Sequence, residues 1–314
     1  LLIAATSILA SLDLGIRQIS LSQSWTILSA DSSNIQAQII SELRWPLTAS
    51  AFLTWGLLGL SGVLMQVLLR NPLADPYILG ISGGAATGAL LSITLGLSTQ
   101  WIESSAFAGA FFSMLLVYLL SRSGKRDHSQ QLLLTGVILA AGWGAAINLL
   151  LILADAQNIH SMLFWLMGDL SMTASPHPAA LLLLLLALLT SWFLARDLNL
   201  LSQGEHKAQT LGSPVGLVRK ITFVIAALST AIAVSMAGTI GFVGLVIPHL
   251  LRLAIGSNHR LLLPAAVLAG GSLLVLADLG ARTLLAPQQL PVGVITAFIG
   301  VPLFIYLLKH RHHS

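Results

Sequence analysis

Two short serine motifs and one histidine are the residues of this chain that could support nucleophilic chemistry. Ser61 and Ser82 each lie in a Gly-x-Ser-Gly pattern of the kind found in intramembrane proteases, and His249 is the histidine in an apolar stretch that could act as a base. The pattern occurs twice in a chain that holds 27 glycines, so it carries little weight. An intramembrane serine protease is kept as a remote alternative.

One pair of opposite charges lies within an apolar stretch. Asp278 and Arg282 are four residues apart, so on a helix they share a face and can form an ion pair. Charges inside a membrane are costly and are often functional. For Arg282, a structural pair and an outward-facing binding charge both remain open, whereas the structural interpretation is favoured for Asp278. An ion-coupled secondary transporter is a second alternative, but it would need paired acids at mid-membrane, and the sequence offers only Asp278.

The chain lacks the residues of several other chemistries. Cysteine is absent, which excludes disulfides, thiolate metal sites and cysteine nucleophiles, and we expect no metal site. No Gly-x4-Gly-Lys-Ser/Thr phosphate loop occurs. We therefore expect no cofactor in this chain, and if its activity uses ATP, the nucleotide must bind to another polypeptide.

The composition points to a membrane as the solvent. Of 314 residues, 56% are hydrophobic and 8% are charged, against about 25% charged in a soluble domain. A helix of about 20 apolar residues spans a bilayer and satisfies its own backbone hydrogen bonds. Since the basic residues lie in short gaps between apolar runs, the net charge of +4 reflects topology rather than binding to nucleic acid.

The elements that must position these residues are predicted as ten transmembrane helices in a single domain, residues 1–314. The first is interpreted as the clipped end of a helix rather than a signal peptide. The boundary near residue 239 is the least secure, because one long kinked helix is the competing interpretation. The predicted helices are residues 1–14, 46–69, 78–97, 104–121, 131–154, 178–195, 220–238, 240–255, 262–285 and 291–308.

The basic residues predict the orientation. If the loop after the second helix is cytoplasmic and the ten helices alternate in direction, Arg17, Arg44 and Arg282 lie outside and twelve basic residues lie inside. This is a strong positive-inside bias, and it places both termini in the cytoplasm. The inside set is Arg70, Arg122, Lys125, Arg126, Arg196, Lys207, Arg219, Lys220, Arg252, Arg260, Lys309 and Arg311.

Three further segments differ from plain connections. The outer segment 155–178 contains an apolar run that suits a short re-entrant or interfacial helix. The inner segment 196–220 is polar and contains a short amphipathic stretch closed by Gly and Pro, which could lie on the cytoplasmic face as a docking surface or be a solvated loop. Small residues recur every fourth position from Gly80 to Gly96, which favours close helix packing over a pore lining.

Several long motifs, in order along the chain, resemble the permeases of binding-protein-dependent ABC importers for iron chelates, haem and vitamin B12. They are residues 44–46 (RWP), 60–66 (LSGVLMQ), 70–84 (RNPLADPYILGISGG), 132–136 (LLLTG), 164–168 (FWLMG), 241–249 (GFVGLVIPH) and 290–294 (LPVGV).

The resemblance implies an all-α integral membrane protein of the type II ABC importer permease class. Such a permease has ten transmembrane helices per subunit and forms a homodimer, with the path for the solute at the twofold axis. The implied partners are a second copy of the chain, two ATP-binding subunits that hold ATP and Mg²⁺, a periplasmic or lipid-anchored binding protein, and membrane lipid, in the cytoplasmic (inner) membrane. No motif distinguishes the chelates.

The resemblance also implies roles for particular residues. Arg44 and Arg282 match outward arginines that meet acidic residues of the binding protein; many relatives carry a further arginine where this chain has Leu47, and Arg17 could replace it. Two cytoplasmic gates are implied at Asn71, Pro72, Leu73, Ala74, Asp75 and Pro76, and at His128, Ser129 and Gln130. The implied ATPase-coupling segment is Gly204, Glu205, His206, Lys207, Ala208, Gln209, Thr210, Leu211, Gly212, Ser213 and Pro214.

Overall fold

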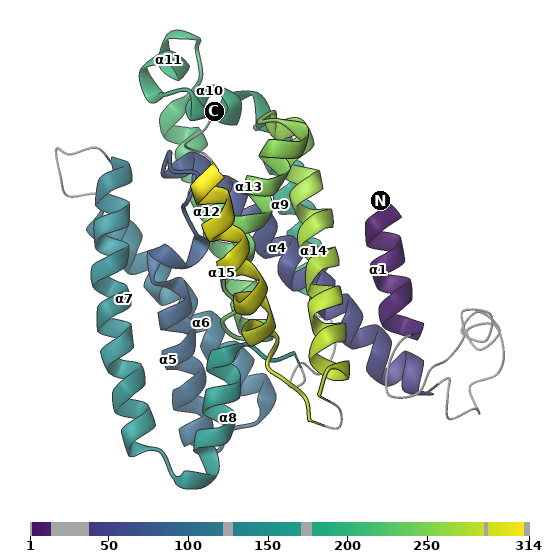
Figure 1. Cartoon of the computed structure of the whole chain (residues 1–314). Coiled ribbons are helices and arrows are strands. Elements are labelled where there is room, and N and C mark those ends of the chain that lie inside the picture. The colour runs from purple at the N-terminus through teal and green to yellow at the C-terminus, as the bar shows by residue number, and fades with distance from the viewer. Residues whose placement is uncertain (1, 14–37, 122–127, 171–177, 286–287, 311–314) are drawn as a thin grey trace.

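The computed structural model describes residues 2–13, 38–121, 128–170, 178–285 and 288–310, and these residues form a bundle of helices (Figure 1). Arg17, Arg122, Lys125, Arg126 and Arg311, which contribute to the predicted orientation, lie outside the described residues. The helices are α1 (Leu2–Asp13), α4 (Trp45–Leu68), α5 (Ile81–Thr94), α6 (Thr99–Leu120), α7 (His128–Leu153), α8 (Ala156–Met167), α9 (Pro178–Phe193), α10 (Ala195–Ser202), α11 (Glu205–Thr210), α12 (Val215–Ala237), α13 (Val243–Ile255), α14 (His259–Thr283) and α15 (Val292–His310), with a π-helical turn η1 (Ile39–Arg44) before α4 and a 3₁₀ turn η2 (Pro76–Leu79) before α5.

Every predicted hydrophobic stretch corresponds to one described helix. By length and composition, five helices could cross a membrane, and a sixth span arises if α9 and α10, bent by 64° at their junction, count as one. Four shorter apolar helices, α1, α5, α13 and α15, fill the remaining predicted positions. The predicted break near residue 239 is confirmed, since α12 ends at Ala237 and α13 begins at Val243; the single kinked helix is wrong.

Two of the short helices begin inside the bundle. α5 has 14 residues and α13 has 13, so at 1.5 Å per residue each is about 20 Å long, less than the hydrocarbon core of about 30 Å. The predicted starts at residues 78 and 240 were therefore too early. In both places the chain before the helix runs irregularly among its neighbours, which is tolerated in a membrane only where protein surrounds the backbone.

Small residues let the central helices approach closely. Gly84 of α5 and Gly109 of α6 lie so near each other that a Cβ on either would overlap the carbonyl of the other. A Cβ on Gly88 would likewise overlap the Ser105 carbonyl. Ser92 completes the contact by donating a hydrogen bond to Ser105 at 2.7 Å. These positions of the small-residue stripe are therefore packing sites, as predicted.

The α4 helix is the centre of the bundle: 94% of the residues in its most apolar membrane-length segment are buried. Its glycines face different partners: Gly59 lies against Ala266 of α14, and Gly62 against Gly244 of α13. Ser61 hydrogen-bonds the Ala226 carbonyl at 2.8 Å and the Thr230 hydroxyl at 2.7 Å, which ties α4 to α12. Because its hydroxyl serves this helix contact, Ser61 does not have the environment of a catalytic nucleophile.

Candidate functional site

The predicted coupling segment forms a compact unit at one end of the bundle, where α10 and α11 project beyond the long helices (Figure 1). The six-residue helix α11 is bounded by Gly204 (φ 120°) and Gly212 (φ 79°), whose left-handed backbone conformations favour glycine. Ala208 of this helix is fully buried, and the Ser213 N–H donates to the Ala208 carbonyl at 3.0 Å. The polar side chains Lys207 and Gln209 point away from the bundle and are exposed.

An ion pair joins this unit to the start of α12. Arg219 Nη1 lies 2.6 Å from Glu205 Oε1, with side-chain exposures of 13% and 27%. The predicted segment thus includes a carboxylate that contacts its own chain, and Arg219, which the sequence reasoning assigned only to the inside charge count, is its partner. The two residues lie on different helices, α11 and α12, so their pairing depends on the fold and gives no sequence signal.

A second contact fixes α10 to the start of α14. Asn199 Oδ1 accepts hydrogen bonds from the His259 backbone N–H at 3.0 Å and lies 2.6 Å from His259 Nδ1. Asn199 Nδ2 donates to Asn258 Oδ1 at 3.3 Å, and Asn258 caps α14. With Ala195, Leu198 and Leu201 of α10 buried, the base of the α10–α11 unit is packed against the long helices of the bundle.

The first predicted gate, residues 71–76, is a rigid turn that folds back into the bundle. Asn71 Oδ1 accepts from the Leu73 N–H at 2.9 Å, and Asp75 Oδ1 accepts from the Tyr77 N–H at 2.8 Å. Pro76 packs against Gly244 of α13, where a Cβ would overlap the proline ring. The resemblance implied a cytoplasmic gate at this segment; the structure adds that its Pro76 end is buried.

Tyr77 links this turn to the break between α12 and α13. The Ile240 N–H donates to the Tyr77 hydroxyl oxygen at 3.2 Å, and Gly136 of α7 lies against the backbone of Ile78 and Leu79. The α12–α13 break and α7 therefore meet at η2. Tyr77 was not singled out from the sequence, because an isolated aromatic residue after two prolines carries no pattern.

The electrostatics of the turn centre on Asp75. Burial raises the pKa of the Asp75 carboxyl to about 6, and the hydrogen bond from the Tyr77 N–H opposes that rise. Asp75 is thus the group in this turn whose charge can change near neutral pH.

The second predicted gate, His128, Ser129 and Gln130, forms the first turn of α7. Gln130 is exposed. The recorded contacts between α7 and η2 lie further along the helix, at Gly136 and at Ala140 beside Gly80. These contacts lie six or more residues beyond the predicted gate, on later turns of α7.

The two predicted docking arginines converge on the end of α1. Arg44 Nη1 donates to the Leu12 carbonyl at 2.5 Å and Arg282 Nη2 donates to the Ser11 hydroxyl at 3.2 Å. Arg282 also pairs with Asp278, at 2.6 Å, as the four-residue spacing predicts. Arg44 is 7% exposed, so its side chain is buried in this structure rather than presented to solvent. Arg17, the suggested replacement, lies outside the described residues.

The same contacts bear on the ion-coupled alternative. Asp278 is 1% exposed and paired with Arg282, which supports its structural role. Asp169, at 9% exposure, is a second buried acid that sequence reasoning missed; it follows α8, the helix expected within 155–178. In the described part of the chain, no group of three or more His, Asp or Glu side chains could hold a metal ion.

The chain is similar over nearly its whole length to known importer permeases. The model of the FecCD transport family matches residues 2–310. The chain is 38% identical to the cobalamin import system permease protein BtuC of Halobacterium salinarum (87% of this chain, 74% of the relative) and 36% identical to the hemin transport system permease protein HmuU of Yersinia pestis (92% and 88%). It is also 39% identical to the uncharacterized ABC transporter permease protein YvrB of Bacillus subtilis (88% and 80%).

Solved structures show the same fold. One described as an inward-facing conformation of a metal-chelate type ABC transporter superposes with a TM-score of 0.86 at 32% identity, covering 98% of this chain and 97% of the other. PsaBC from Streptococcus pneumoniae, at 15% identity and a TM-score of 0.58, shares the fold alone. These relatives are membrane permeases rather than enzymes. The chain belongs to the FecCD transport family, the iron-chelate, haem and vitamin B12 permeases of ABC importers that its motifs resemble.

Proposed function

We propose that this chain is the membrane-spanning subunit of an ATP-driven importer in the cytoplasmic (inner) membrane, and that it passes a metal chelate inward. The substrate class is a corrinoid, haem or a ferric siderophore, the first two of which are named for relatives at 36–38% identity. ATP and Mg²⁺ are held by separate ATPase subunits. A binding protein delivers the chelate from the outer side, and both termini of the permease are cytoplasmic.

The observation that carries the proposal is the construction of the α10–α11 unit. Its exposed polar face projects from the bundle, while its base is held by the Glu205–Arg219 ion pair and by Asn199. A surface that is free on one side and rigidly held on the other can pass a displacement from a docked ATPase to the membrane helices. A solvated loop without a partner would not need those attachments.

The opposite end of the bundle supports docking of the binding protein. Arg44 immediately precedes α4 and Arg282 lies in the last turn of α14. Both contact the last residues of α1, so two guanidinium groups lie close together there. Acidic residues of a binding protein would complement this charge and set its orientation and association rate. Because Arg44 is engaged with the Leu12 carbonyl, docking would have to exchange that contact for a new one.

The exposure of α7 supports a homodimer. Only 6% of the residues in the most apolar membrane-length segment of α7 are buried, against 94% for α4. Its exposed face carries the small residues Ala141, Gly142 and Ala145 and the polar Asn148 as well as leucines, and no atom lies within 4 Å of a Cβ placed on Gly142. Small and polar residues are typical of helix–helix interfaces in membranes. We assign this face to the second copy and to the solute path between the two copies.

In the proposed cycle, binding of ATP closes the two ATPase subunits and shifts both α11 helices. Each shift moves α12 through Arg219, and α12 ends at the break that contacts Tyr77 in η2. The path along α7 then opens to one side of the membrane at a time. A weakly polar path of small and apolar side chains suits a large chelate, because it must release the solute as readily as it admits it.

Reconstitution tests the proposal. Liposomes with this chain and its ATPase should hydrolyse ATP faster when the loaded binding protein is added, and should accumulate the chelate. Replacing residues 205–211 with Gly and Ser should abolish both effects, whereas the same replacement of the outer residues 95–98 should not. Normal coupling after the α11 replacement would show that the coupling assignment is wrong, and chelate uptake without ATP would contradict the importer class.

A further inference from the structure

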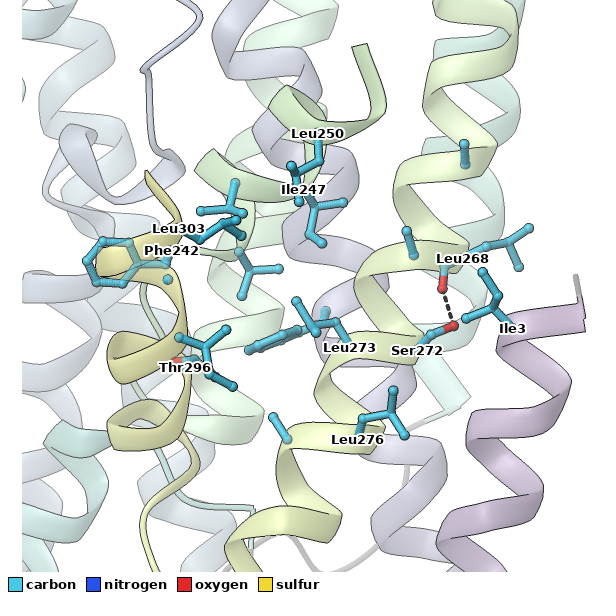
Figure 2. A pocket seen from close by; sticks show the side chains of 18 of the residues that line it. Ile3, Phe242, Ile247, Leu250, Leu268, Ser272, Leu273, Leu276, Thr296 and Leu303 are labelled. Atoms are coloured by element: carbon cyan, nitrogen blue, oxygen red, sulfur yellow. Dashed lines mark hydrogen bonds between the residues drawn. The ribbon is translucent and has the colours of Figure 1, made fainter. Parts of the chain in front are cut away.

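An apolar cavity of about 420 Å³ lies between α1, α4, α13, α14 and α15. Figure 2 shows Ile3 of α1 beside Leu268 and Ser272 of α14 on one side, and Phe242 and Thr296 towards α15 on the other. None of the described residues that line the cavity is charged. The cavity is separate from α7 and from the α10–α11 unit.

The hydroxyl groups in the cavity wall are already paired. Ser272 donates to the Leu268 carbonyl at 2.6 Å, and Thr296 donates to the Gly293 carbonyl at 3.0 Å, each within its own helix. Water in such a cavity would lack most of the two to four polar partners that it needs. A metal chelate would likewise find no ion pair. The wall therefore selects a flexible, uncharged, apolar occupant.

The cavity opens sideways rather than towards either end of the bundle. Its rim includes Leu276 of α14 and Ile299 of α15, which are 45% and 53% exposed. In a chain that spans a membrane, such side chains at the middle of the bundle face lipid tails. On α15, the neighbouring residues Phe298 and Val301 line a different hollow, together with Leu166 and Met167 of α8, so the mouth of the cavity is on the other side of α15.

Phe242 bounds one end of the cavity. Phe242, in the wall, has a left-handed conformation (φ 72°) that is strained for a residue with a side chain. Its ring packs where Gly300 of α15 has no side chain, and a Cβ on Gly300 would overlap it. The aromatic ring thus occupies one end of the space between α13 and α15 and leaves the rest of that space unfilled.

We propose that the cavity binds one acyl chain of a membrane phospholipid, which enters laterally between α1 and α15. A void would forfeit the dispersion contacts of its lining, and an acyl chain restores them without burying a polar group. The bound chain becomes part of the packing between α1, α14 and α15. This inference requires only that the protein spans a membrane and is independent of the transported solute.

Trp55 provides a direct test, because it lines the cavity yet is only 1% exposed. A variant that keeps Trp55 and replaces the other six tryptophans with Phe is reconstituted in bilayers of phospholipid brominated in the middle of the acyl chains. Bromine quenches tryptophan only on close approach, so it can reach Trp55 only from inside the cavity. We expect quenching at least half as strong as that of a reference variant that keeps Trp192, which is 44% exposed on α9.

The control is Ala269→Phe, which fills the cavity from α14. It should remove the quenching of Trp55 and leave that of Trp192 unchanged, whereas Leu182→Phe on the exposed face of α9 should change neither. A Trp55 that is not quenched while Trp192 is quenched would overturn the proposal.

The unaltered protein gives an independent measurement, should the tryptophan variants fail to fold. A phospholipid with a photoreactive group in its acyl chain should label the segment 265–277 of α14. Labelling confined to α9 and the outer faces of α6 would contradict the proposal. A cross-link between cysteines placed at Ile3 of two copies would show instead that a second copy covers the mouth, and would overturn the proposal too.

Discussion

The carboxylate of Glu205 and the guanidinium of Arg219 lie 2.6 Å apart, and this contact joins the projecting helix α11 to the first turns of α12. Replacing Glu205 with Gln should lower ATP hydrolysis stimulated by the binding protein, and chelate uptake, roughly 2- to 5-fold, which corresponds to about 0.5–1 kcal/mol for a partly exposed pair. The charge-reversed double variant Glu205→Arg with Arg219→Glu should recover part of both activities. Asp197→Asn on α10 is the matched control, and a double variant no better than its singles would contradict a direct pair.

Tyr77→Phe tests the link between the inner turn and the α12–α13 break. The substitution removes the oxygen that accepts from the Ile240 N–H and leaves that buried donor unpaired, at a cost of about 1–3 kcal/mol. We expect a lower unfolding temperature and a larger passive leak of chelate in liposomes without ATP. Leu182→Ala, on the exposed face of α9, should leave both quantities unchanged. An unaltered leak would separate Tyr77 from gating.

Asp75 gives the turn a pH dependence with a definite sign. Its pKa is raised from 3.8 to about 6 by burial, so the folded state binds the proton more tightly than the unfolded state does. The free energy of unfolding should therefore fall as pH rises from about 4 to about 6, and stay at the lower value above that window. Asp75→Asn keeps an oxygen that can accept from the Tyr77 N–H and removes this dependence. Thermal unfolding in detergent between pH 4 and 8 measures the difference, and parallel curves would rule out the assignment.

Gly84→Ala should be destabilising although alanine favours helices. The new Cβ would overlap the Gly109 carbonyl, forcing α5 and α6 apart at a cost of about 1–3 kcal/mol. Gly216→Ala is the matched control, because nothing lies within 4 Å of its Cβ and a helical Gly→Ala change there should stabilise by about 0.5–1 kcal/mol. Unfolding temperatures of the two variants should shift in opposite directions; a shift in the same direction would contradict the packing argument.

Ala145→Trp on the exposed face of α7 should weaken self-association if that face meets a second copy. A bulky ring prevents the close backbone approach that small residues permit. Leu182→Trp on α9 places the same ring on a face expected to meet lipid, and should have no effect. Cross-linking in native membranes gives the dimer fraction for each variant. Equal dimer fractions would place the interface elsewhere.

Hydrophobic runs were sufficient to locate the helices, because membrane insertion depends on local composition. The Asp278–Arg282 pair was also predictable, since both residues lie on one helix face four positions apart. The break near residue 239 was found because Gly238 and Gly241 interrupt an apolar run, and Gly238 indeed has a positive φ of 68°.

What sequence reasoning missed depends on contacts between distant segments. The return of Pro76 into the bundle is set by Gly244 of α13, far along the chain. Arg44 was expected to face outward, yet it is 7% exposed because the end of α1 accepts its hydrogen bond. Neither the charge of a residue nor its side of the membrane indicates whether a neighbouring element will cover it. The burial of Asp169 was missed for the same reason.

The shortness of α5 and α13 has a consequence for biosynthesis. A segment of 13 or 14 helical residues is too short to partition into a bilayer by itself, and its irregular approach would expose backbone polar groups to lipid. We therefore expect α5 to enter the membrane as a hairpin with α6, against which its glycines pack. We expect α13 to enter only once α4 is in place. The order in which the ribosome releases these partners then decides whether the nascent chain reaches its folded topology.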